Sequence, residues 1–384
     1  MRRVFRTFSV SLLLFGSVFS YSQLIANSRN LFNSTKTLHA YALKRQIQSK
    51  TEAENIISTA MSRAQLYESE IARTHLVDGM VVNLGRTGEM IDQCDSLLFS
   101  SIRYVSLDKL GWHDKADNAW RAIEGSRDHG AWLRHPRCYR SISRDMLLGL
   151  MLAMTRRPPG YEQHLTQLMS GIDQKGGFFG TGPVYVSYLS PGLARLMAAI
   201  AKRDHSMSAS IPQSVAGGYS TAELEVMITP AGYRSHLGGL TAWLELELLA
   251  HGLSLDDPRP TFLGAASDLS SPFVPFAMTS QRLDWITDRL VKVDPNNLFF
   301  RYLRLRAAKA LTSPVRLDLL KELLSMKQFP VERLPMDCDR KSDYLWQRDD
   351  KSINYEPIAC QVEYAGIDFL WMVALLVEDP EAVK

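Results

Sequence analysis

The acidic residues best placed for chemistry stand directly before apolar stretches. Residues 92–95 (Asp-Gln-Cys-Asp) precede the apolar run that follows Ser96. Asp95 can cap a helix that starts here, because a carboxylate oxygen accepts backbone N–H bonds of the first turn. The functional alternative is that Asp92 or Asp95 faces a cavity as an acid or a base.

A second such segment is rich in Arg, His and Tyr. Residues 132–140 (Trp-Leu-Arg-His-Pro-Arg-Cys-Tyr-Arg) offer His135 and Tyr139 as substrate contacts. Arg144 and Asp145 follow at the start of the next apolar run, where the helix dipole favours a negative charge. Since charges are seldom buried unless they are paired, an Arg144–Asp145 pair with a structural role is the alternative.

Asp95 and Asp145 together suggest a pair of catalytic carboxylates. Glycoside hydrolysis needs two such groups, one that protonates the leaving oxygen and one that activates water or attacks the sugar. If Cys94 is bonded to Cys138, their Cα atoms lie within about 7 Å of each other, and the two aspartates come from neighbouring helices. We therefore expect Asp95 and Asp145 to be the acid and the base, in either order.

Other polar and aromatic side chains stand at the starts of apolar runs or in a long loop. His236 could carry a proton near neutral pH or contact a sugar, although a lone histidine at a helix start is more often structural. Tyr344 and Trp346 could stack on sugar rings or pack beneath their loop. The expected substrate contacts are completed by Asp92, Arg144, Tyr188 and Asp368.

The chain has four cysteines, none of them in a C-x-x-C pair, which excludes zinc or thioredoxin-like spacing. We prefer the disulfides Cys94–Cys138 and Cys338–Cys360, because each joins neighbouring segments; buried free thiols are the alternative. There is no P-loop, Gly-x-Ser-x-Gly, dinucleotide-binding or His-Glu-x-x-His motif. We expect no cofactor and no metal.

Helical periodicity dominates the chain, so the predicted fold is all-α or mainly α. Some expected helices are apolar nearly all round and should be buried on most sides, whereas others have one apolar stripe and should face solvent. Helices are expected at residues 40–74, 94–107, 114–124, 142–155, 161–172, 190–202, 235–252, 279–292, 297–311, 314–326 and 363–378.

The two kinds of helix alternate along the chain. This order favours an (α/α)6-type toroid of inner and outer helices with long loops at one rim. A stacked solenoid of helix pairs is the competitor, but no repeat of fixed period is found. The stretches at residues 77–89, 175–188, 216–233 and 335–363 are expected to be functional loops or to hold short strands at the rim of a cleft.

The N-terminus has the pattern of an export signal. Arg2, Arg3 and Arg6 precede an apolar run, and small residues follow it, so residues 1–22 are expected to be a signal peptide and residues 23–384 a single domain. The run is shorter than the roughly 20 residues that cross a bilayer, so we expect a periplasmic or secreted protein with no stable membrane span after cleavage. Retention of this segment as an anchor is the alternative.

The net charge of +3 is close to balance, and several positive charges lie in the N-terminal segment, so nothing suggests an electrostatic nucleic-acid binder and we expect no nucleic-acid partner. A neutral or mildly charged ligand fits this charge better.

Residues 94–99 (Cys-Asp-Ser-Leu-Leu-Phe) and 143–149 (Ser-Arg-Asp-Met-Leu-Leu-Gly) resemble segments of the six-hairpin (α/α) toroid glycosidase-like superfamily. In architecture, the resemblance covers most of residues 40–380 and implies a fold whose members cleave or bind polysaccharides. We expect an exported glycoside hydrolase of a poly- or oligosaccharide. A polysaccharide lyase using Tyr139, His135 or His236 and Arg144, and a noncatalytic glycan-binding envelope protein, are the alternatives.

Overall fold

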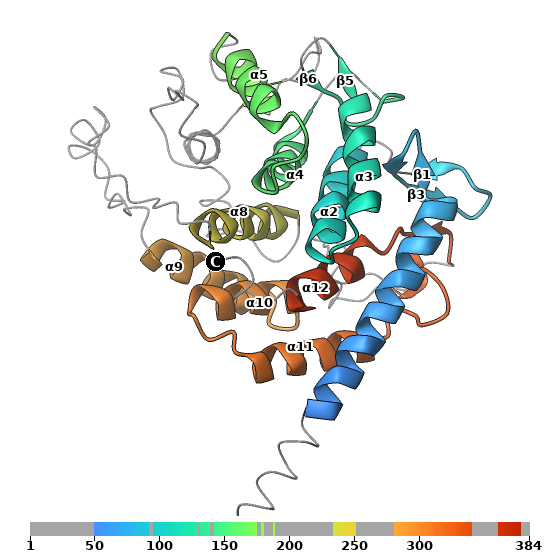
Figure 1. Cartoon of the computed structure of the whole chain (residues 1–384), viewed down its shortest axis with the longest axis vertical. Coiled ribbons are helices and arrows are strands. Elements are labelled where there is room, and N and C mark those ends of the chain that lie inside the picture. The colour runs from blue at the N-terminus through green and yellow to red at the C-terminus, as the bar shows by residue number, and fades with distance from the viewer. Residues whose placement is uncertain are drawn as a thin grey trace, which may run out of the picture. The chain divides into compact units, whose positions relative to one another are not determined.

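In the computed structural model the protein is mostly helical, as predicted (Figure 1). The described residues from 59 onward belong to one compact unit. The structure describes residues 50–91, 95–128, 131–138, 142–174, 178–179, 187–188, 233–250, 280–339 and 360–377.

A helix at residues 50–74 comes first in the described chain. The other helices are α2 (Ser96–Lys109), α3 (His113–Gly125), α4 (Arg144–Thr155), α5 (Tyr161–Gln174), α8 (Tyr233–Ala250), α9 (Ser280–Val293), α10 (Leu298–Ala307), α11 (Ser313–Ser325), a 3-10 turn η4 (Asp337–Asp339) and α12 (Ile367–Val377). None of the helices in the described ranges combines the length and the hydropathy that a bilayer-spanning segment requires.

The strands are short and lie in the loops between helices. Asp78 and Gly79 form the turn between β1 and β2 with positive φ angles, as a tight two-residue hairpin requires. β3 pairs antiparallel with β4 and also with β9, which comes from the other end of the chain. The strands are β1 (Leu76–Val77), β2 (Met80–Val81), β3 (Asn83–Gly85), β4 (Met90–Ile91), β5 (Arg127–Asp128), β6 (Ala131–Trp132), β7 (Phe178–Phe179), β8 (Ser187–Tyr188) and β9 (Val362–Glu363).

The helix boundaries depart from the prediction mainly at two ends. α12 begins at Ile367 rather than at residue 363, because Glu363 belongs to β9 and Gly366 has a φ of +65°. α10 ends at Ala307 rather than at residue 311, because Lys309 adopts a φ of +54° that a helix does not accept. The helix expected at residues 190–202 lies outside the described residues.

Burial separates two kinds of helix, as the apolar pattern predicted. Residues 96–107 of α2, 145–155 of α4 and 367–376 of α12 are buried throughout. In α3 and α11 the buried residues form a stripe instead. α4 lies between α2 and α8 and packs against both (Figure 1). α12 also packs against α2. Of the amphipathic helices, α3 lies against α2 and α11 lies against α12.

The buried helices α2, α4 and α12 start at the same end of this unit. The amide of Leu98, in the first turn of α2, lies 3.3 Å from Sδ of Met146, in the first turn of α4. The segment that leads into α2 pairs with the segment that leads into α12, through β3 and β9. We call this end, where α2, α4 and α12 start, the N-terminal rim.

The C-terminal ends of α2, α8 and α10 meet around Glu247. Its Oε2 accepts a hydrogen bond of 3.1 Å from Lys109 Nζ, at the end of α2. Its Oε1 accepts bonds of 2.7 Å from Arg306, at the end of α10, and 3.0 Å from the Trp243 indole of α8. Beside this cluster Arg156, after α4, donates to Asp108 at 2.5 Å. The C-terminal ends of α2, α8 and α10 are thus joined to one another, and the end of α4 is joined to that of α2.

Electrostatics explain why the cluster joins these ends. Several helix C-termini, each with a partial negative charge, converge here, and cations favour that position. The side chains of Lys109 and Glu247 are only 1% and 3% exposed. Burial alone would raise the pKa of Glu247, but Arg306 and Lys109 outweigh it and hold the pKa below its ordinary value of 4.5. Glu247 is therefore ionised in the folded protein, and its one negative charge is shared between two cations.

Aromatic side chains fill the space between α8, α10 and α12. The ring of Trp371 lies 4.9 Å from that of Phe299 and 5.9 Å from that of Trp243. Gly239 lies against Phe299 and Phe300 without room for a side chain. This packing brings α12 close to α8 and α10.

A disulfide joins Cys338 in η4 to Cys360 before β9, with a Cα–Cα distance of 4.8 Å. This is the pair expected from the sequence. The Asp337 carboxylate reinforces the junction, because its Oδ1 accepts the backbone amide of Gln361 at 2.9 Å. Cys138 is also disulfide-bonded, and Cys94 lies outside the described residues.

Replacing Glu247 by Gln tests the cluster. Glu247→Gln removes the negative charge that pairs with Lys109 and Arg306, and removing one member of a buried ion pair costs about 3–5 kcal/mol. We expect the free energy of unfolding, measured by urea denaturation, to fall by that amount. The matched control Glu322→Gln breaks the partly exposed Arg301–Glu322 pair and should cost under about 1 kcal/mol. Equal effects for the two variants would contradict this role of Glu247.

Candidate functional site

The candidate site is the N-terminal rim at the starts of α2 and α4. Gly149 of α4 lets the two helices approach closely, because a Cβ placed on it would lie 2.8 Å from Leu98 Cδ1 and 3.1 Å from Leu98 Cα. The backbone amide of Leu97 donates to the Arg134 carbonyl at 2.9 Å. The segment after β6 is therefore fastened to the first turn of α2, so Arg134 lies next to Asp95.

Asp95 occupies the N-cap position of α2 but does not cap it. Its side chain makes no capping hydrogen bond, so the interpretation of Asp95 as a helix cap is wrong. Its carboxylate lies 3.8 Å from the Arg134 guanidinium, and the Asp95 side chain is 32% exposed. The positive charge of Arg134 competes for the oxygen that would otherwise cap the helix. Asp95 is left accessible to a ligand.

Asp145 lies in the first turn of α4, as predicted, and is 4% exposed. Its Oδ1 accepts a hydrogen bond from the Ser143 hydroxyl. Ser143 is the N-cap residue of α4 but makes no capping bond, because its hydroxyl is turned to Asp145 instead. The position at a helix N-terminus favours a carboxylate. Asp145 therefore lies at the base of the rim, in a more enclosed place than Asp95.

His135 is buried and both of its ring nitrogens meet backbone groups. Nδ1 accepts the amide of Arg137 at 3.0 Å, so Nε2 carries the proton and donates to the Val77 carbonyl at 3.1 Å. These bonds hold the segment after β6 against β1. A substrate contact at His135 would break one of them, so the geometry assigns it a structural role.

His236 and Asp368 are buried in the first turns of α8 and α12. The His236 ring lies 5.6 Å from that of Phe300, which places it in the packing between α8 and α10. Asp368 is in the first turn of α12, at the same rim as Asp95 and Asp145. Both stay candidate contacts from the sequence.

The side chains of the remaining candidate residues lie outside the described part of the structure. Arg144 is the first residue of α4 and Tyr188 the last of β8, and the side chains of both lie outside the description. Asp92, Cys94, Tyr139, Tyr344 and Trp346 lie outside the described residues.

Sequence reasoning missed His75 and Glu363. His75 follows the helix at residues 50–74, and Glu363 ends β9, at the edge of a stretch predicted to be functional. His75 Nε2 and Glu363 Oε1 lie 3.5 Å apart. Nothing in the spacing of two residues so far apart in the chain signals this contact, which depends on the pairing of β3 with β9.

Within the described ranges, no group of three or more His, Cys, Asp or Glu side chains is arranged to hold a metal ion.

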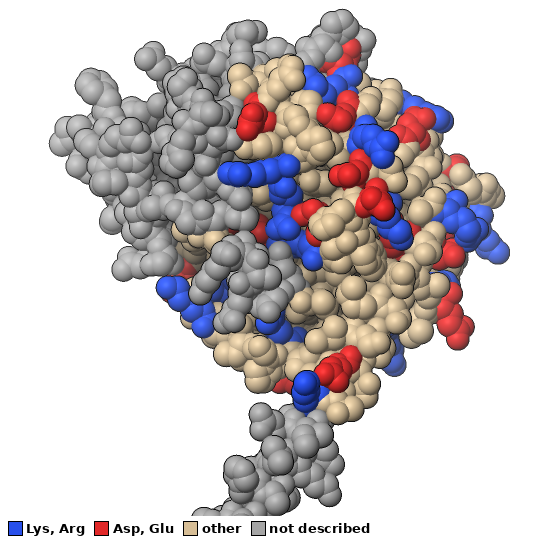
Figure 2. Space-filling view, viewed as in Figure 1, with Lys and Arg blue, Asp and Glu red and all other residues tan. Residues whose placement is uncertain are grey.

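Acidic and basic side chains are interspersed over the described surface seen in Figure 2. This face has no broad region of one sign.

No family model matches this sequence, and no curated protein is significantly similar to it.

Replacing Gly149 tests the close approach of α2 and α4. Gly149→Ala places a methyl group against the Leu98 backbone, and overpacking of this kind costs about 1–3 kcal/mol. We expect urea denaturation to show that loss. Gly125→Ala is the control, since a Cβ there meets nothing within 4 Å and alanine is the better helix former by up to about 1 kcal/mol. A neutral or stabilising Gly149→Ala would show that the two helix starts are further apart.

Proposed function

We propose that this chain is an exported carbohydrate-active enzyme with an (α/α)6-type toroid, and that it hydrolyses a poly- or oligosaccharide at the N-terminal rim. The observation that carries the proposal is the adjacency of the starts of α2 and α4, with Asp95 on one and Asp145 on the other. Export rests on the signal-like segment at residues 1–22, which lies outside the described residues.

The direction of the buried helices supports the toroid. α2, α4 and α12 start at one end, and the ends of α2, α4, α8 and α10 are joined at the other. Amphipathic helices alternate with the buried ones along the sequence, and α3 lies against α2, α9 against α8, and α11 against α12. A ring of parallel inner helices gathers their N-termini, with their partial positive charges, around one opening.

The environments of the two aspartates support the chemistry. A glycosidase needs one carboxylic acid to protonate the leaving oxygen and one carboxylate to activate water or attack the sugar, and unlike surroundings are what separates the two roles. Asp95 is partly exposed beside Arg134, whereas Asp145 is enclosed and bonded by Ser143. The pair therefore offers two carboxyl groups in different settings on adjacent helices.

The burial of Asp145 favours a second candidate function. At 4% exposure this carboxylate reaches a substrate only if the rim around it rearranges. A noncatalytic glycan-binding protein of the cell envelope needs no such access. It would bind sugars at the rim through Asp95 and Arg134 and turn over none of them.

Substitution of the two aspartates decides between these candidates. Purified protein is incubated with bacterial cell-wall and capsular polysaccharides, and new reducing ends are measured. On the glycan that is cleaved, Asp95→Asn and Asp145→Asn should each lower turnover by about 100-fold or more, because each removes an acid–base group. Asp117→Asn, on the exposed face of α3, is the control and should behave as wild type.

Three outcomes would count against hydrolysis by these residues. Wild-type turnover in both variants would exclude Asp95 and Asp145 as catalytic. Binding without turnover of any glycan would support the noncatalytic function. Products that absorb in the ultraviolet would identify a lyase, with an unsaturated sugar at the new end.

A further inference from the structure

The first turn of α2 receives hydrogen-bond acceptors from outside the helix. A side chain in the N-cap position, here that of Asp95, can accept the backbone amide of the second or third helical residue, which in α2 are Leu97 and Leu98. The Leu97 amide donates to the Arg134 carbonyl at 2.9 Å. The Leu98 amide donates to Sδ of Met146 at 3.3 Å. Both amides that Asp95 could cap are therefore already occupied.

The thioether is a poor substitute for a capping carboxylate. Methionine sulfur accepts hydrogen bonds only weakly, whereas a bond from a backbone amide to a carboxylate at an N-cap is charge-assisted and stronger. Met146 and Leu98 are fully buried, while the Asp95 side chain is 32% exposed. The helix thus uses the weaker acceptor and leaves the stronger one at the surface. Such departures from the locally favoured arrangement are concentrated at functional sites.

Met146 also links the positions of the two aspartates. It follows Asp145 directly in the first turn of α4, and its sulfur lies against the amide of Leu98 in the first turn of α2. Gly149, further along α4, leaves no room for a side chain against Leu98, so the two helices stay close. The Met146 side chain therefore sets the start of α4, with Asp145, against the start of α2, with Asp95.

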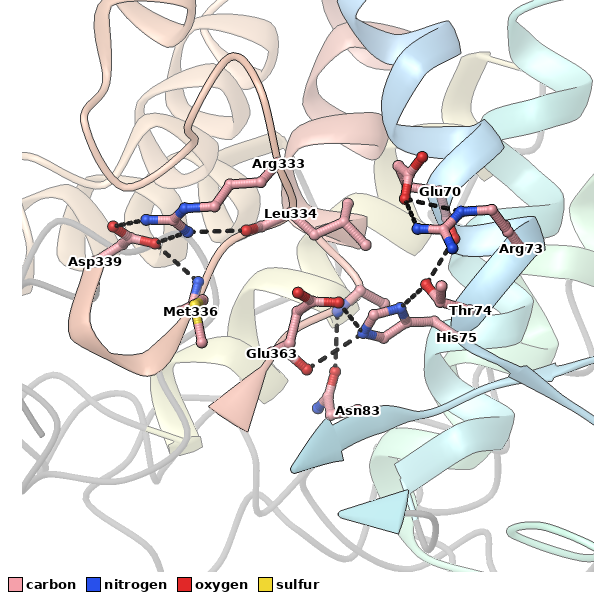
Figure 3. Close-up of polar contacts among 11 residues, drawn as sticks. Glu70, Arg73, Thr74, His75, Asn83, Arg333, Leu334, Met336, Asp339 and Glu363 are labelled. Carbon is pink, nitrogen blue, oxygen red and sulfur yellow. Dashed lines mark hydrogen bonds and ion pairs between the residues drawn. The ribbon is translucent and has the colours of Figure 1, made fainter. Parts of the chain in front are cut away.

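The start of α12 is also held by a side chain from another segment (Figure 3). Asn83, in β3, accepts the backbone amide of Ala365 through its Oδ1 at 3.1 Å. Ala365 lies two residues before α12, and Asn83 is buried. At the N-terminal rim, acceptors from neighbouring segments thus hold the starts of two helices.

We propose that Met146 is a positioning residue, whose thioether occupies the Leu98 amide and thereby keeps the Asp95 carboxylate out of the helix cap and available to a ligand at the rim. Without the sulfur, the buried Leu98 amide loses an acceptor, which is costly, and Asp95 stands at the position from which a side chain can replace it. Asp95 then caps α2 and is withdrawn from the ligand. The effect on turnover rests on the proposed function, whereas the effect on Asp95 does not.

A cycle of variants tests whether Met146 controls Asp95. Hydrogen exchange of the full chain, followed by mass spectrometry, measures the opening of residues 95–98. In otherwise wild-type protein, Asp95→Ala should change this exchange rate by less than about twofold, because Asp95 makes no capping bond and its contact with Arg134 is long and partly exposed. In a Met146→Leu background Asp95 caps the helix, so Asp95→Ala should raise the rate about fivefold or more.

Met151→Leu provides the matched background. Met151 is also fully buried in α4, and exchange of methionine for leucine nearly conserves volume, so both variants should fold. In the Met151→Leu background, Asp95→Ala should act as it does in the wild type. An equal effect of Asp95→Ala in all three backgrounds would overturn the proposal, whether or not any glycan is cleaved.

Turnover of a glycan that the wild type cleaves supplies a second reading. Met146→Leu should lower kcat at least about 10-fold, and Met146→Gln should lower it less, because the glutamine oxygen can accept the Leu98 amide in place of the sulfur. A role in apolar packing alone predicts the reverse order, since leucine replaces methionine in a core better than glutamine does. That reverse order, or wild-type turnover in Met146→Leu, would overturn the proposal. If no form cleaves any glycan, the proposed function fails and the exchange cycle decides the role of Met146.

Discussion

The architecture depends on the ion pairs that the buried Glu247 carboxylate forms with Lys109 and Arg306. Parallel helices packed side by side place their negative C-terminal ends together, which is unfavourable in a buried setting. Lys109 and Arg306 supply the positive charges, and Glu247, near the end of α8, pairs with both of them. With Arg156 against Asp108 beside it, the same end of the molecule also holds α4.

Two of the helices joined at this end, α2 and α4, start at the N-terminal rim. There the helix dipoles create a positive potential instead, which suits carboxylates. Asp145 and Asp368 occupy first turns at this rim, and Asp95 stands just outside α2. Neither Asp95 nor Ser143 caps its helix. The Asp95 carboxylate is turned toward Arg134 instead, and the Ser143 hydroxyl is turned toward Asp145.

The helical part of the fold could be predicted because apolar residues recur along the chain with the period of an α-helix. Apolar repeats located the helices of the described ranges to within a few residues, and all-round apolar character marked α2, α4, α8 and α12 as buried. One interpretation of Asp95, that its side chain caps α2, is wrong. The local sequence shows a capping position but does not show that Arg134 will compete for the carboxylate. Local reasoning also extended α12 into β9, since the partner strand β3 lies far away in the sequence.

The long-range clusters were beyond prediction for the same reason. His75 and Glu363 are brought together by strand pairing between distant segments. Glu247 did carry a signal, since a charged residue inside an apolar helix must find a partner to be buried. The sequence does not say which of many lysines and arginines provides it. Packing decides that Lys109 and Arg306 do.

Hydrogen exchange with bound sugar tests the central claim that ligands meet this protein at the N-terminal rim. Exchange of the full chain is followed by mass spectrometry with and without oligosaccharides prepared from bacterial cell-wall and capsular polysaccharides. Protection should appear at residues 95–98 and 143–147 and be absent around Lys109, Arg156 and Arg306. Protection confined to the Glu247 end, or none with any of these sugars, would contradict the account.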